Sequence, residues 1–240
     1  MTFAPAPLSI MHANATPMFV DVETDTGNPD DNLVEAAITP RRKAIMPMHL
    51  YGQKVDMVYL KKLAQKHNLF LIEDAAHYLE GVRDNIRVDN CQKRLVIAFT
   101  PPRALPAVKG RTVSTSQEHL RELLQKLRLH GMSTDALHRY TTLYRHYDVE
   151  VEGWKYNMYN LQAALLIDQI DEIESRRQAR ERLANYYRAS FGGCPGIEVP
   201  VFIPGVKQVM NNLLCPIGWL TNLWKFMLSS ASIDKLATNG

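Results

Sequence analysis

Cysteine is scarce in this sequence, and the three cysteines lie far apart. They are Cys91, Cys194 and Cys215, and no two of them form a C-x-x-C pair. An odd number at such wide spacing excludes a disulfide framework and predicts no metal site of the zinc type. We therefore expect a reduced, cytoplasmic protein stabilised by its hydrophobic core.

Long apolar runs are also absent. The first 17 residues have neither the basic start nor the long apolar centre of a signal peptide. The most apolar stretch, 213–228, is interrupted by Pro216, Gly218 and Lys225, and it is shorter than the roughly 20 residues that cross a bilayer. The sequence predicts no membrane span.

No block of like charge occurs in the chain. Its 28 basic and 25 acidic residues leave a net charge of +3. The short basic clusters at 41–43 and 176–177 are typical of a solvated surface. We expect no nucleic acid among its partners.

Short apolar runs alternate with helical periodicity between residues 17 and 115. The strands predicted from these runs are 17–22, 44–50, 69–74, 95–99 and 112–115. Helices are predicted at 32–38 and 56–67, the second with Asp56 as N-cap and with Val58, Leu60, Leu63 and Ala64 on its inner face. Strands interleaved with helices predict an α/β fold, in which helices cover both faces of a mostly parallel sheet.

The second half of the chain is predicted to be mainly helical. A helix over 117–129 is followed by a loop-like stretch and then by a long amphipathic segment, 158–191. One face of that segment carries Leu161, Leu165, Ile170 and Ile173, and its arginines, among them Arg176 and Arg177, are expected to turn outward. Beyond Gly192 the sequence predicts the beginning of a small α+β domain.

Polar residues follow three of the predicted strands, at 49–52, 73–77 and 100–103. Ligands of an open α/β sheet bind outside the carboxyl ends of its strands. A carboxylate such as Asp74 at a strand end can hold a protonated ring nitrogen, which is the partner that pyridoxal phosphate requires. The alternative is that Asp74 only caps the turn that follows.

Four stretches carry a resemblance to a known family. The runs 16–52 (TPMFVDV…HLYG), 61–77 (KKLAQKHNLFLIEDAAH), 120–131 (LRELLQKLRLHG) and 153–177 (GWKYNMYNLQAALLIDQ…) resemble the DegT/DnrJ/EryC1/StrS family of pyridoxal-phosphate-dependent nucleotide-sugar aminotransferases. The GWKYN variant is similar to the branch that makes 4-amino-4-deoxyarabinose. The resemblance implies the large domain of the aspartate aminotransferase fold.

The same resemblance implies roles for four residues. Asp74 falls on the aspartate that pairs with the pyridine nitrogen, and His77 on the Gln or His close to the ring. Phe3 falls on an aromatic residue that stacks on the ring, and Asn157 on an asparagine that reaches the cofactor phosphate across a homodimer interface. Each has a plainer alternative: His77 as a turn residue, Phe3 as part of a free terminus, and Asn157 as a helix N-cap.

One aligned position departs from the family in a way that changes the chemistry. The family reads approximately F-S-F-x-P-T-K-N-L-G, and this chain has IAFTPPRALP from residue 97 to 106, so that Arg103 replaces the Schiff-base lysine and Ala98 a phosphate-binding serine. Arginine stays protonated and has no primary amine, so it cannot form the Schiff base. Arg103 can bind a phosphate or carboxylate through two hydrogen bonds instead. Lys109 is an alternative amine if the loop is shifted.

The resemblance also implies a domain plan and a function. We expect a pyridoxal-phosphate-transferase-like large domain at 1–155 without the family's N-terminal phosphate-binding part, a connecting helix at 156–191, and an incomplete small domain at 192–240. The implied reaction transfers an amino group from glutamate to a nucleotide-linked keto sugar, in a homodimer or with a complete homologue. The alternative is a non-catalytic subunit that binds a nucleotide sugar.

Overall fold

The structure is a computed structural model of the chain. It describes residues 2, 4–79, 81–83, 86–87, 95–99, 110–133, 148–192, 201 and 206. The small domain predicted at 192–240 lies almost wholly outside these residues, and so do Phe3 and Arg103.

The parallel part of the sheet is built from the segments around residues 43–49 and 70–74. The strands of the core are β1 (Ala44–Ile45), β2 (Phe70–Leu71), β3 (Glu73–Asp74), β6 (Leu95–Phe99) and β7 (Gly110–Ser114). β1 runs parallel to β2, β3 runs parallel to β6, and β7 pairs with β6 in the antiparallel sense. A parallel bridge between Met48 and Asp74 continues the β1–β2 pairing as far as β3. β4 (Val82–Arg83) and β5 (Ile86–Arg87) form a separate antiparallel pair.

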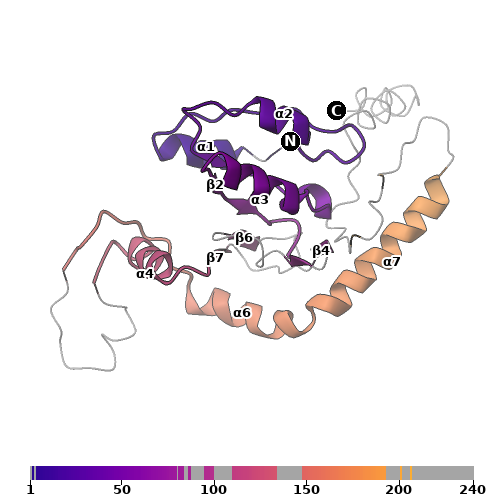
Figure 1. Ribbon diagram of the computed structural model, residues 1–240. Helices are drawn as coiled ribbons and strands as arrows, with labels where there is room; N and C mark the ends of the chain where they lie inside the picture. The colour runs from indigo at the N-terminus through magenta and orange to yellow at the C-terminus, as the bar shows by residue number, and fades with distance from the viewer. Residues whose placement is uncertain are drawn as a thin grey trace, which may run out of the picture.

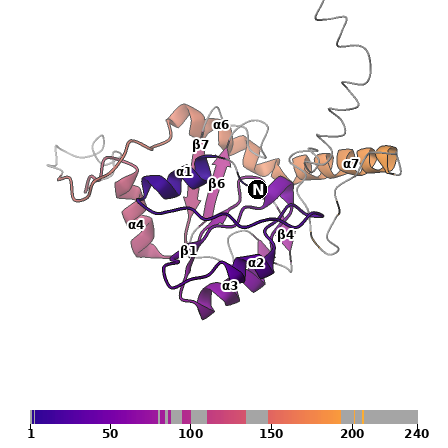
Figure 2. The same cartoon turned by 90° about the horizontal axis from the view of Figure 1, so that it is seen from above.

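Helices lie on both sides of the strands, as the sequence predicts (Figures 1 and 2). They are α1 (Pro5–His12), α2 (Asp31–Ala36), the short 3₁₀ turn η1 (Leu50–Gly52), α3 (Met57–Lys66), α4 (Glu118–Leu127), α6 (Asn160–Asp171) and α7 (Ile173–Phe191). Figure 1 places α1, α2 and α3 on one side of β6 and β7, and α6 and α7 on the other. The α/β class is confirmed. Among the described helices, none combines the length and apolar character needed to cross a bilayer.

Helix α3 forms where the sequence predicts it, because both its cap and its apolar face are local. The Asp56 side chain accepts a hydrogen bond from the backbone N–H of Tyr59 and so caps the first turn. Leu60 and Leu63 are buried against Leu71 of β2 in the main hydrophobic cluster. The prediction for Val58 is wrong, since this side chain is 37% exposed and is not part of the main hydrophobic cluster.

The strand predicted at 17–22 is not a strand. Only Val22 makes a β-bridge there, to Pro29, while Met18 and Phe19 are 56% and 68% exposed. An apolar run becomes a strand only if another backbone segment supplies the hydrogen bonds of a ladder. In the described part of the chain no other strand lies along these residues.

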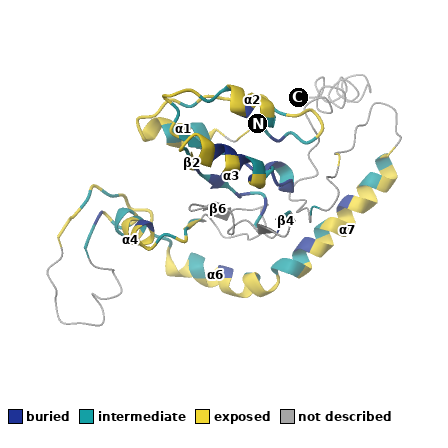
Figure 3. Cartoon of the chain, viewed as in Figure 1, coloured by how far each residue is buried: buried dark blue, intermediate teal, exposed yellow. Residues whose placement is uncertain are grey.

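The long segment predicted at 158–191 is two helices rather than one, because the chain breaks at Glu172 between α6 and α7. Much of α6 and α7 is coloured as exposed in Figure 3. Leu166 is the buried residue of α6, whereas Leu161 and Leu165, predicted to face inward, are 77% and 46% exposed. Arg177, predicted to turn outward, is only 4% exposed. The periodicity located the helices correctly. Of the predicted inner face, Ile173 packs against the buried cluster as expected, whereas Leu161, Leu165 and Ile170 are exposed.

Candidate active site at the carboxyl ends of the parallel strands

Asp74 ends β3 at the edge where the parallel strands finish. Its backbone N–H donates to the Pro47 carbonyl at 2.9 Å, and its carboxylate Oδ1 accepts from the backbone N–H of Ala76 at 3.0 Å. Asp74 therefore caps the turn that follows it. Among the described residues nothing donates to Oδ2, so the same carboxylate still has an oxygen for a ligand.

His77 lies in the turn directly after Asp74. Its half-buried ring stacks on Tyr51, with the ring centroids 6.2 Å apart and the planes inclined by 10°. Tyr51 takes the left-handed conformation, φ 51° and ψ 22°, which is uncommon for a residue with a side chain. The turn that follows β1 thus places an aromatic ring against the imidazole next to Asp74.

Asn157 is held by a short antiparallel pairing at the end of α4. Segments 148–156 and 127–133 are joined by two β-bridges, and the Trp154 and Tyr156 N–H groups donate to the Leu127 and Arg128 carbonyls at 2.7 and 2.8 Å. The N-cap of α6 is Tyr159, so the alternative role of Asn157 as helix cap is wrong. Its Oδ1 is buried without a hydrogen-bond partner in the described part of the chain.

The glycine of the GWKYN stretch makes this pairing possible. A Cβ on Gly153 would lie 2.2 Å from the backbone nitrogen of Gly131, and Gly131 itself has φ +73°. Backbones that approach so closely exclude any side chain. The two glycines therefore fix the path of the chain that leads to Asn157.

Packing brings Asn157 towards the Asp74–His77 turn. The next residue, Met158, packs against the cluster of Ala75, Tyr78 and Leu166. Ala75 directly follows Asp74, so the residue after Asn157 packs against the cluster that contains the residue after Asp74. This proximity exists within a single chain.

The predictions for Phe3 and Arg103 concern residues outside the described part of the chain. Two neighbours of these residues are described. The Thr2 hydroxyl lies 3.6 Å from Sδ of Met48, the residue bridged to Asp74. In β6 the backbone of Ala98 pairs with that of Arg111.

Sequence reasoning missed a buried pair beside the site. The His49 ring lies 2.7 Å from a Glu73 carboxylate oxygen through Nε2, and both side chains are fully buried. Burial lowers the pKa of His49 although the Glu73 hydrogen bond raises it, so the ring is neutral at neutral pH. The sequence did carry one signal for this arrangement. Neighbouring side chains of a strand point to opposite faces, so Glu73 must face away from the site that Asp74 faces.

A family model matches residues 1–224 of the chain, that of the DegT/DnrJ/EryC1/StrS aminotransferase family. This chain belongs to that family. It is 36% identical over 201 residues to the spore coat polysaccharide biosynthesis protein SpsC of Bacillus subtilis, covering 83% of this chain and 52% of that protein. It is 32% identical over 187 residues to GDP-perosamine synthase of Caulobacter vibrioides, covering 78% and 48%.

Solved structures give the same result. The crystal structure of S. venezuelae DesV in complex with a ketimine intermediate matches with a TM-score of 0.80 and 31% identity, over 88% of this chain and 54% of that chain. A DegT/DnrJ/EryC1/StrS aminotransferase from Brucella abortus matches with a TM-score of 0.75 and 27% identity, over 88% and 55%. The chain spans about half the length of the relatives that it matches.

The described residues fit the ring of pyridoxal phosphate, the cofactor of this family. The Oδ2 atom of Asp74, which accepts no hydrogen bond in the described part of the chain, suits a ring N–H. The half-buried Asn157 has a buried Oδ1 without a hydrogen-bond partner in the described part of the chain, and a half-turn of the amide would present N–H donors to a phosphate. No group of three or more His, Cys, Asp or Glu side chains among the described residues could hold a metal ion.

Proposed function

We propose that this chain carries the part of a sugar-aminotransferase site that binds the ring of pyridoxal phosphate. The observation that supports this most is the carboxylate of Asp74, fixed at the carboxyl end of a parallel strand with one oxygen still available. The reaction of the whole protein would transfer an amino group from glutamate to a nucleotide-linked keto sugar. The relatives named for polysaccharide biosynthesis and for GDP-perosamine synthesis support this substrate class.

Asp74, His77 and Asn157 each have a separate role in this proposal. When bound, pyridoxal phosphate supplies an electron-withdrawing ring, which is strongest while its ring nitrogen is protonated. Asp74 holds that proton by charge and hydrogen bond. His77, kept in place by Tyr51, lies against the ring. Asn157 donates its amide to the phosphate, within one chain or across a homodimer.

Arg103 prevents covalent attachment at the family position. A guanidinium carries no primary amine and keeps its charge, so it binds an anion rather than an aldehyde. We infer that this chain holds its cofactor without a covalent bond and needs an amine from a partner, such as a complete homologue, for turnover. We place this chemistry in the cytoplasm, because three widely spaced cysteines suit a reducing compartment.

Pyridoxamine phosphate is the most direct probe, because its binding requires no lysine. We expect the purified protein to bind it, and Asp74→Asn to weaken binding about tenfold through loss of a charge-assisted hydrogen bond. As a control, Asn28→Ala replaces a buried polar residue outside the proposed site, and it should leave the affinity for pyridoxamine phosphate unchanged. Equal affinity for wild type and Asp74→Asn would refute the proposed site.

The second candidate function is a non-catalytic subunit, which Arg103 favours. The variant Arg103→Lys separates it from a site that lacks only its amine. If only the amine is missing, pyridoxal phosphate followed by borohydride will label residue 103 in the variant. If no lysine is labelled while a nucleotide sugar still binds, the subunit role is supported.

A further inference from the structure

A buried pair of titratable side chains lies behind the proposed site and has no task in it. Resting on the proposed function, we propose that His49 and Glu73 are positioning residues that hold Asp74 in its ring-binding orientation. Neither side chain reaches solvent, and their atoms meet at 2.7 Å. Burying two titratable groups costs desolvation energy that apolar residues at the same positions would avoid, so the pair calls for an explanation.

Hydrogen bonds fix the proton arrangement of the pair. The backbone N–H of Val55 donates to Nδ1 of His49 at 3.3 Å. Nδ1 therefore carries no proton, and Nε2–H donates to the Glu73 carboxylate. The imidazole is satisfied on both sides, so it connects the turn after β1 to strand β3.

His49 contacts both residues of β3. Its ring holds the Glu73 side chain, and its backbone N–H donates to the Asp74 carbonyl at 3.1 Å. Successive side chains of a strand point to opposite faces. Anchoring Glu73 on one face therefore prevents β3 from rotating and directs the Asp74 carboxylate to the other.

The packing around the His49 ring keeps the imidazole in this position. The His49 ring meets the fully buried ring of Tyr78 edge-on, with centroids 5.3 Å apart. Tyr78 belongs to the cluster that also contains Ala75, the residue after Asp74. Among the described residues, the charged groups that act on His49 are Glu73, Lys54 and Asp74, and Lys54 is itself fully buried. The pair thus connects the residue that follows the β1 segment, His49, to the residue that precedes Asp74 in β3, Glu73.

Three substitutions separate positioning from mere support of the fold. Glu73→Leu removes the anchor, Glu73→Gln keeps an acceptor for Nε2–H, and Asp74→Asn removes the group that is positioned. We expect Glu73→Leu to weaken pyridoxamine phosphate binding about tenfold. This is the lower end of the loss found when a residue that orients a metal-binding side chain is removed. Glu73→Gln should stay within about threefold of wild type, because the hydrogen bond survives.

The decisive readout is the ring nitrogen of bound ¹⁵N-labelled pyridoxamine phosphate. In Glu73→Leu its chemical shift should move towards the unprotonated value, and in Glu73→Gln it should stay. In the Asp74→Asn background Glu73→Leu should have no further effect, because both substitutions act through one group. An unchanged ring shift in folded Glu73→Leu, or additive effects of the two substitutions, would overturn the inference.

The coenzyme-free protein tests the inference even if the proposed function fails. Absence of pyridoxamine phosphate binding to wild type would refute the function alone. The Ala76 amide, which donates to Asp74 Oδ1, should then exchange its hydrogen about tenfold faster in Glu73→Leu, while the Leu60 amide of α3 remains protected. Unchanged exchange at Ala76 would refute positioning. If Glu73→Leu does not fold, Glu73→Asp, which withdraws the carboxylate by one methylene, takes its place.

Discussion

The two helical layers of this protein differ in how completely they bury their apolar side chains. On the α3 side, Leu60 and Leu63 are buried in a cluster of seven residues that includes Val55 and Leu71. On the α6 side the cluster contains three buried residues in the described part of the chain, Ala75, Tyr78 and Leu166. Much of α6 and α7 is exposed (Figure 3). The exposed large side chains of these helices include Leu161, Ile167, Ile170 and Tyr186.

This difference shows what helical periodicity can establish. Helix α3 lies between strands and α2, so its apolar stripe coincides with its buried face. Helix α6 is apolar around much of its circumference, and its single buried residue is set by where Ala75 and Tyr78 lie. Periodicity therefore predicts the buried face only where one side of a helix is clearly more apolar than the other.

The largest expected effect tests the contrast between these two layers. Leu60→Ala should lower the free energy of unfolding by about 3 kcal/mol, because Leu60 is fully buried and truncation leaves a cavity. Leu161→Ala, the same change at a side chain 77% exposed, should cost less than about 0.5 kcal/mol. Urea unfolding followed by circular dichroism measures both. Equal losses would show that the α6 face is buried in solution, and the contrast would then be wrong.

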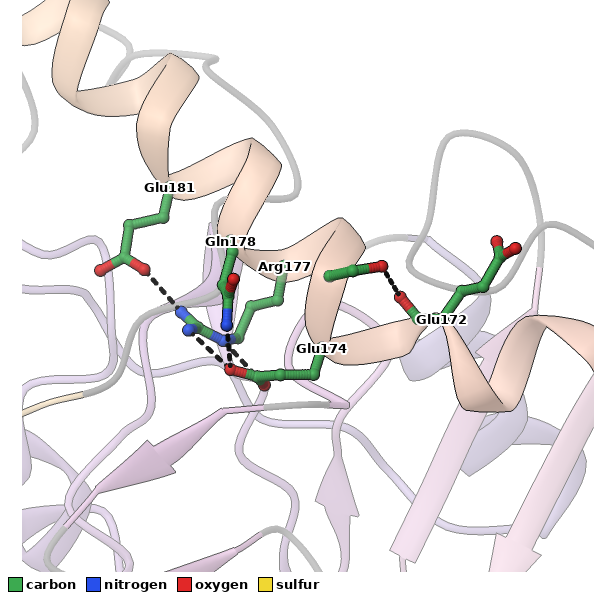
Figure 4. A network of polar contacts seen from close by, with 6 residues as sticks. Glu172, Glu174, Arg177, Gln178 and Glu181 are labelled. Atoms are coloured by element: carbon green, nitrogen blue, oxygen red, sulfur yellow. Dashed lines mark hydrogen bonds and ion pairs between the residues drawn. The ribbon is translucent and has the colours of Figure 1, made fainter.

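A smaller effect concerns the buried arginine of α7. The Arg177 guanidinium bonds to Glu174 at 2.9 Å and to Glu181 at 2.8 Å, and these hydrogen bonds raise its pKa (Figure 4). Arg177→Ala should cost roughly 1–2 kcal/mol, less than a fully buried pair because both carboxylates are about half exposed. The neighbouring Arg176, bonded to Glu172 and 38% exposed, is the matched control.

Arg176→Ala should cost no more than about 0.5 kcal/mol, as is usual for exposed ion pairs. Thermal and urea unfolding of the two variants, at low and high salt, provide the measurement. A loss for Arg176→Ala as large as that for Arg177→Ala would mean that burial of the guanidinium contributes nothing to the stability of α7.

The smallest expected effect concerns pH on the α3 side. Burial and the charge of Asp56 raise the pKa of Asp31, the first residue of α2, from 3.8 to about 6. The folded protein binds this proton more tightly than the unfolded chain does. Ionised Asp31 therefore destabilises the folded protein above about pH 6, and this destabilisation disappears as the pH falls towards 3.8. Asp31→Asn should therefore stabilise at neutral pH by less than about 1 kcal/mol, since the side chain is partly solvated.

Unfolding of wild type and Asp31→Asn across this pH range gives the difference directly. The lowered pKa of His49 changes stability with pH in the opposite sense: the stability that the neutral ring contributes is lost as the pH falls below 6.5, the ordinary pKa of the unfolded chain. Both proteins contain His49, so this effect cancels when wild type and Asp31→Asn are compared. Asp56→Asn retains a good N-cap and should lower the pKa of Asp31 in an NMR titration. A stabilisation by Asp31→Asn that does not change with pH would contradict the assignment.

Much of the candidate site followed from the sequence. Asp74 was predicted at a strand end next to His77, because an apolar run that stops at two carboxylates shows where a buried strand finishes. The contact of Tyr51 with His77 was not predicted, since it depends on a left-handed turn 26 residues earlier in the chain. The role of Glu73 was missed for a similar reason: its partner, His49, is 24 residues away.

By itself the sequence determined the helix that Asp56 begins, the strand that Asp74 ends, and the chemistry that a guanidinium at residue 103 forbids. These depend on hydrogen bonds, periodicity and bond types within a few consecutive residues. Only the tertiary structure decided that Arg177 is buried, that Leu161 is exposed, and that His49 holds Glu73 while Asp74 stays accessible. Burial and pairing depend on which distant segment packs against each residue, and local spacing does not contain that information.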